Sequence, residues 1–168
     1  DNNIAVGYAS LGANTSGTQN VAIGSSASNL NDTGDYNVAI GINALRDNTG
    51  SDGNVIIGIN AGLTATGANN VALGGNTLRG ASGNSGSSNV AIGYNTLADI
   101  AGASGLTAVG HQALANVTTG TENVALGYQA LYTNVDGSKS TAVGYKALYN
   151  SDPASAIDTM NVAVGYNA

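Results

Sequence analysis

The chain has 168 residues, of which 25 are glycine and only 8% are charged, with 4 Lys+Arg against 10 Asp+Glu. The absence of cysteine excludes a disulfide scaffold and cysteine-ligated zinc. The single proline excludes collagen. The net charge of −6 argues against a nucleic-acid partner, and without an apolar run of about 18 residues we expect no membrane insertion by this segment.

A short motif, Asn-Val-Ala-Ile-Gly with small variations, recurs ten times along the chain. Its glycines are Gly7, Gly24, Gly41, Gly58, Gly74, Gly93, Gly110, Gly127, Gly144 and Gly165. Most intervals between them are 17 residues and the extremes are 16 and 21, which indicates stacked units with insertions in surface loops. We therefore expect a single repeat domain over 1–168.

The Val-Ala-Ile part of each motif predicts a strand, from 21–23 in the second copy to 162–164 in the tenth, because it is β-branched and alternates with period 2. A 17-residue unit is too short for a helix pair but holds two short strands and two turns. The sequence therefore predicts an all-β fold, a parallel β-solenoid of about ten coils.

Each position of the repeat then becomes a column of stacked side chains. We expect the Val and Ile/Leu columns that flank the alanine to point into the coil, and a leucine column on a second strand to close this core. The asparagine four residues before the motif glycine predicts a ladder of stacked amides. The leucine column is Leu45, Leu78, Leu97, Leu114, Leu131 and Leu148.

The middle residue of the expected strand is alanine in nine of ten copies. If Val and Ile point inward, this alanine column points outward, and a smooth apolar strip on a surface favours an interface with another copy. The alternative is that the alanines line a narrow half of their own coil. The candidate oligomer interface is Ala22, Ala39, Ala72, Ala91, Ala108, Ala125, Ala142 and Ala163.

Solenoid ends require polar caps, and neither end of this sequence contains a recognisable one. This pattern favours an internal slice of a longer fibrous chain.

The segments 89–97 (Asn-Val-Ala-Ile-Gly-Tyr-Asn-Thr-Leu), 123–131 (Asn-Val-Ala-Leu-Gly-Tyr-Gln-Ala-Leu) and 141–148 resemble the head repeats of trimeric autotransporter adhesins. They are also similar to the Gly-Tyr-Gln-Ala-Leu arrays of phage tail-fibre and tail-spike proteins. The resemblance implies a left-handed β-roll, a homotrimer, and an extracellular location on a cell surface or virion. The 17-residue repeat departs from the adhesin repeat of about 14 residues and favours the fibre arrays.

Enzyme motifs are absent: the sequence contains no Gly-x-Gly-x-x-Gly, P-loop or Gly-x-Ser-x-Gly pattern. The only histidine, His111, stands in a tyrosine column and reads as a repeat substitution. Asp35 and Asp52 are 17 residues apart and could stack; we interpret them as solvated loop acids, with calcium ligation left open. We expect no enzyme activity, no cofactor and no metal site.

Four tyrosines form the candidate surface-binding aromatics, Tyr128, Tyr132, Tyr145 and Tyr149. Tyrosines on an outer face can hold a sugar ring, and the alternative is that they cover the leucine column. The expected partner is a cell-surface glycan or protein receptor.

The leading hypothesis is a structural and adhesive fibre segment, trimeric, that projects or forms a receptor-binding surface. One alternative is an ice-binding solenoid, although its threonine column is broken in most coils. A further alternative is a solenoid that binds or processes polysaccharide.

Overall fold

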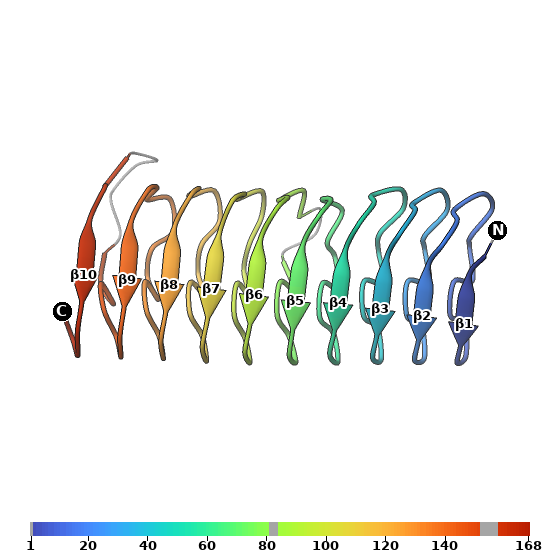
Figure 1. Ribbon diagram of the computed structural model, residues 1–168, viewed down its shortest axis with the longest axis horizontal. Coiled ribbons are helices and arrows are strands. Elements are labelled where there is room, and N and C mark those ends of the chain that lie inside the picture. The colour runs from blue at the N-terminus through green and yellow to red at the C-terminus, as the bar shows by residue number, and fades with distance from the viewer. Residues whose placement is uncertain (1, 81–83, 152–157) are drawn as a thin grey trace.

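The computed structural model describes residues 2–80, 84–151 and 158–168. Its strands form one parallel sheet in sequence order, so each strand pairs with the strand one repeat earlier and one repeat later (Figure 1). This confirms the expected all-β solenoid. The strands are β1 Ile4–Val6, β2 Val21–Ile23, β3 Val38–Ile40, β4 Val55–Ile57, β5 Val71–Leu73, β6 Val90–Ile92, β7 Thr107–Val109, β8 Val124–Leu126, β9 Thr141–Val143 and β10 Val162–Val164.

Each coil contains one three-residue strand, and the chain returns through consecutive turns, so the expected second strand is wrong for the part of the chain described. The leucine column lies on this return segment in the left-handed region, with φ of 50° at Leu45 and 48° at Leu78. The leucines of this column are fully buried from Leu45 to Leu131, and Leu148 is partly buried, so the column closes the core as expected. Short turns fit here because a 17-residue coil leaves little length for two extended segments.

The side of each strand that faces the core is the opposite of the expected one. The alanine column is buried inside its own coil, and its members are 0% exposed from Ala22 to Ala142, with Ala163 partly buried in the last coil. The flanking Val and Ile/Leu columns point outward. The candidate interface was therefore assigned to the wrong face: Ala22, Ala39, Ala72, Ala91, Ala108, Ala125, Ala142 and Ala163 pack against the leucines of their own chain.

Space inside the coil explains this reversal. The strand and the return segment approach so closely that a methyl group opposite a leucine fills the gap. The exception in the alanine column, Ile56, is fully buried, and the leucine position of the same coil is Gly62. A Cβ atom on Gly62 would lie 3.1 Å from the Ile56 Cγ2 atom, so the larger strand residue occupies the space of the missing leucine.

This exchange of volume predicts a coupled pair. We expect Ile56→Ala to lower the free energy of unfolding by about 2–4 kcal/mol, because it leaves a cavity, and Gly62→Leu alone to destabilise through overpacking by about 1–3 kcal/mol. The double substitution restores the arrangement of the other coils and should recover most of the loss. Urea unfolding of the four proteins measures this; additive losses in the double variant would contradict the packing account.

The predicted asparagine ladder is confirmed. The Oδ1 atom of Asn37 accepts a bond from the backbone N–H of Asn54 at 3.0 Å, and its Nδ2 atom donates to the Ser51 carbonyl at 2.8 Å. A second ladder, which the sequence analysis missed, starts eleven residues later: Asn48 Nδ2 donates to Asn31 Oδ1 at 2.9 Å and to the same Ser51 carbonyl at 3.0 Å. Both ladders satisfy buried loop backbone, as an interior requires.

Two substitutions of Asn37 in this ladder are expected to lower stability to different extents. Asn37→Leu leaves the Asn54 N–H without its acceptor, so we expect a loss of about 1–3 kcal/mol. Asn37→Ser should lose less, because Ser140 occupies the same column and its hydroxyl accepts from the Asn161 N–H at 3.3 Å. Thermal unfolding of both variants checks this order; equal midpoints for leucine and serine would refute the role of the amide.

The motif glycines end each strand as expected. At Gly41, φ is +132°, and a Cβ atom would lie 2.5 Å from the Gly58 carbonyl oxygen of the next coil. The stacking of coils therefore excludes a side chain at this position. No helix within the described ranges is long and apolar enough to cross a membrane.

Candidate functional site

The outward face of the sheet is a continuous apolar surface. Two columns of side chains flank the buried alanine column, and we call these two columns the outward face. Their residues are valine, isoleucine, leucine or threonine in each strand from β1 to β10. Within it Ile23, Ile57, Ile92 and Leu126 are 36–38% exposed, and each column is in register from coil to coil. The outward face contains no charged residue. Its strands all lie side by side, so the face extends along the whole sheet (Figure 1).

A stack of aromatic rings lies next to the motif glycines. Ring centroids are separated by 5.8 Å between Tyr94 and His111, 5.2 Å between His111 and Tyr128, 5.2 Å between Tyr128 and Tyr145, and 4.9 Å between Tyr145 and Tyr166. The rings are near parallel because the repeat places one above the next. His111 is thus a member of the stack, as its column position predicts.

The four candidate tyrosines divide between two stacks. Tyr128 and Tyr145 have a ring on both faces and present only their edges. Tyr132 and Tyr149 form a separate pair, with centroids 5.1 Å apart, and the ammonium of Lys146 lies 5.0 Å from the Tyr149 centroid. A ring with both faces covered cannot hold a sugar by its face, which leaves Tyr132 and Tyr149 of these four, and each of them lines a hollow.

The hollow has a volume of about 310 Å³ and spans the coils of β5 to β8. Its apolar part is Ala98 and Ala115, at the column where the next two coils have Tyr132 and Tyr149. The change from tyrosine to alanine creates the space and leaves Tyr132, the first ring of its pair, at one end. Tyr94, the first ring of the longer stack, also lines it.

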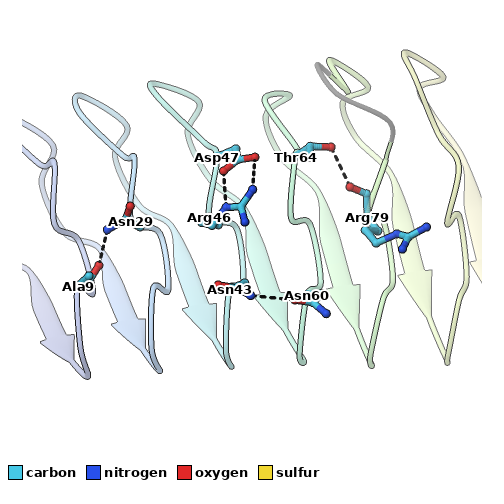
Figure 2. A network of polar contacts seen from close by, with 8 residues as sticks. All are labelled: Ala9, Asn29, Asn43, Arg46, Asp47, Asn60, Thr64 and Arg79. Atoms are coloured by element: carbon cyan, nitrogen blue, oxygen red, sulfur yellow. Dashed lines mark hydrogen bonds and ion pairs between the residues drawn. The ribbon is translucent and has the colours of Figure 1, made fainter.

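Polar side chains complete the hollow. Arg79 and Asp99 lie at its other end, with the Arg79 guanidinium 3.9 Å from the Asp99 carboxylate and both side chains about half exposed (46% and 58%). In Figure 2 the Arg79 carbonyl accepts a bond from Thr64 while the guanidinium extends toward the following coil. The amides of Asn95 and Asn116 also line the hollow, and neither side chain bonds to another residue of the described ranges.

Other polar contacts lie outside the hollow, and most of them join neighbouring coils. Figure 2 shows Asn43 donating to the Oδ1 atom of Asn60 and Asn29 donating to the carbonyl of Ala9. Arg46 bonds to Asp47 at 2.6 Å, and this hydrogen bond raises the pKa of the Arg46 guanidinium. The hydrogen bond from Lys139 to Asp158 likewise raises the pKa of Lys139. Neither pair lies in the hollow.

The loop acids hold backbone amides of the neighbouring coil. Asp35 Oδ1 accepts from the Thr18 N–H at 2.6 Å, and Asp52 Oδ1 accepts from the Asp35 N–H at 2.8 Å. The two carboxylates therefore stack through the backbone, as their spacing suggested. Across residues 2–80, 84–151 and 158–168, no group of three or more His, Asp or Glu side chains is placed to hold a metal ion.

The residues that surround Tyr132 were not among the residues predicted for the site. Arg79, Ala98 and Ala115 precede Tyr132 in one column, and the gap between Arg79 and Tyr132 in that column was the available signal. A second hollow, of about 390 Å³, lies beside Leu148 and Tyr149, and Asn167 and Ala168 also line it.

Comparisons with protein-family models, with curated proteins and with solved structures gave no match to this chain.

Proposed function

We propose that the chain is a structural and adhesive fibre segment in which three copies pack their outward faces together around one axis. The observation that carries this proposal is the outward face itself, which is uncharged over ten successive strands and apolar except at Thr107 and Thr141. Soluble proteins seldom leave long apolar strips in water, and such strips mark interfaces. A cyclic arrangement lets one face satisfy itself on equivalent copies.

The resemblance of the motif to adhesin heads and phage fibre arrays supports three as the number of copies and an extracellular surface, of a cell or virion, as the location. The corrected orientation strengthens the physical argument, because valine and isoleucine supply far more apolar area for an interface than alanine does. The rod shape of the stacked coils (Figure 1) suits a segment that holds a binding surface away from its anchor.

Several of the threonines that would serve ice binding are bonded to a neighbouring coil. Thr118 donates to the Asp136 carboxylate at 3.0 Å, Thr119 donates to the same carboxylate at 2.6 Å, and Thr66 donates to the Asn84 carbonyl at 3.1 Å. The flat outward face has valine and isoleucine where an ice-binding face requires repeated threonine. These contacts favour the fibre segment over the ice-binding alternative.

The mass of the chain in solution tests the proposal. Light scattering at micromolar concentration should give three times the 16.4 kDa of one chain. A mass of one chain at this concentration would contradict the trimer and the proposed fibre with it.

A further inference from the structure

We propose that the hollow between Arg79 and Tyr132 is a binding site for a neutral pyranose oligosaccharide that lies along the rod. An oligosaccharide is then the class of ligand that the adhesive segment binds, and in this respect the inference rests on the proposed function. The hollow itself is built by a single chain, from the return segments of the coils of β5 to β8.

Two tyrosines at the start of the aromatic stacks line this hollow. In the longer stack an interior ring has both faces covered by neighbours about 5 Å away, so only a ring at either end of a stack can receive a ligand on its face. Tyr132 begins one stack and Tyr94 begins the other. Gly75 stands before Tyr94 in its column and Ala115 stands before Tyr132; neither replaces the missing ring. Two such rings line one hollow.

The polar groups of the hollow can bond to the hydroxyl groups of a sugar. Each of the Asn95 and Asn116 amides offers two donors and an acceptor, and neither has a partner within the described residues. The Arg79 guanidinium adds donors and the Asp99 carboxylate adds acceptors, and their 3.9 Å contact at an exposed site contributes little to stability. Neighbouring hydroxyl groups of a sugar pair with such donors and acceptors while the C–H face of its ring lies on tyrosine.

The size and charge of the hollow suit a neutral sugar. A volume of about 310 Å³ is at the small end of ligand pockets and suits a mono- or disaccharide unit, with the rest of a longer glycan following the rod. One arginine and one aspartate leave the hollow near neutral, whereas the whole chain has a net charge of −6. An acidic sugar therefore meets an unfavourable field, which selects a neutral one.

Saturation-transfer NMR with four defined probes tests the site: cellotriose, maltotriose, triacetylchitotriose and sialyllactose, each at millimolar concentration. We expect at least one of the three neutral trisaccharides to bind and sialyllactose to bind more weakly. No binding by any neutral probe, or stronger binding by sialyllactose than by all three, overturns the proposal.

Two variants place the binding in the hollow. Ala115→Tyr extends the Tyr132 stack by one ring, covers its open face and fills the space, and should abolish binding; the column accepts tyrosine in the next two coils. Tyr132→Ala removes the ring and should raise the Kd by about three- to tenfold. Circular dichroism confirms that each variant is folded. Binding that persists unchanged in a folded Ala115→Tyr or Tyr132→Ala protein overturns the assignment.

Tyr36→Ser is the matched control, because Tyr36 is 59% exposed and lies in the loop before β3; it should bind as the wild type does. Loss of binding in this variant equal to that in Tyr132→Ala would overturn the site. A chain that binds sugar as a monomer would refute the trimer and leave the hollow standing, whereas a trimer that binds no neutral probe would refute only the hollow.

Discussion

Ile92→Asp combined with Leu126→Asp is expected to convert a trimer into folded monomers. Both residues lie on the outward face and are 36% exposed in the single chain, so a carboxylate there is hydrated as long as the chains are apart. Association would bury it without a partner, at a cost of several kcal/mol for each group, and three-fold symmetry repeats that cost in every chain. Light scattering gives the mass, and circular dichroism shows whether the coils remain folded.

The matched control adds the same charge elsewhere. Ala101 and Asn150 are exposed and lie away from the strands, so Ala101→Asp with Asn150→Asp should leave the mass at that of three chains. If the outward-face variant keeps the mass of the wild type, the outward face is not the interface. If the control dissociates equally, net charge rather than location decides the association.

Ala91→Asp is expected to destabilise the coils themselves. Ala91 is fully buried between strand and return segment, so this carboxylate would have neither water nor a partner and would exceed the space of a methyl group. A loss of several kcal/mol is a large part of the stability of a typical domain. Because each coil contacts only its neighbours, we expect unfolding to spread from β6 in both directions.

Ile92→Asp, one residue further along β6, is the control for this experiment. The two variants have the same substitution on the same strand and differ only in the side of the sheet. Urea unfolding at a concentration where the chain is monomeric should show a clear loss for Ala91→Asp and a loss within about 1 kcal/mol for Ile92→Asp. The reverse order would show that alanine points outward after all.

The comparison of strand and column shows what the sequence could determine. The period, the β-branched triplets, the asparagine ladder and the strand-ending glycines all follow from the repeat, because each depends on residues of one column. Which side of the strand faces the core depends instead on the width of the coil. A larger residue normally points inward, but here the return segment with its leucines already fills the interior.

One signal for the correct orientation was present in the sequence. The leucine column has two exceptions, Ser28 and Gly62, and Gly62 belongs to the same coil as Ile56, the exception in the alanine column. A large residue that appears where a leucine disappears indicates that the two columns share one space. Substitutions that occur together in one repeat are thus more informative than the majority residue of either column.

The candidate site was less predictable than the fold. The tyrosine columns were recognised, but Tyr128 and Tyr145 cover each other because the repeat that aligns them also stacks their rings. The hollow exists where the repeat is interrupted, at Ala98 and Ala115, and it needs side chains from four coils. A pattern of repeated residues does not predict a hollow that forms where the repeated residue is missing.

Cross-linking through an engineered cysteine tests the central claim most directly, because the chain has no cysteine of its own. Ile92→Cys places one thiol on the outward face of each copy, and Ala101→Cys places one on an exposed loop. With a trifunctional maleimide, the account predicts a covalent band of three chains on a denaturing gel for Ile92→Cys and single chains for Ala101→Cys. Single chains for Ile92→Cys, with its thiol fully modified, would contradict an assembly through the outward face.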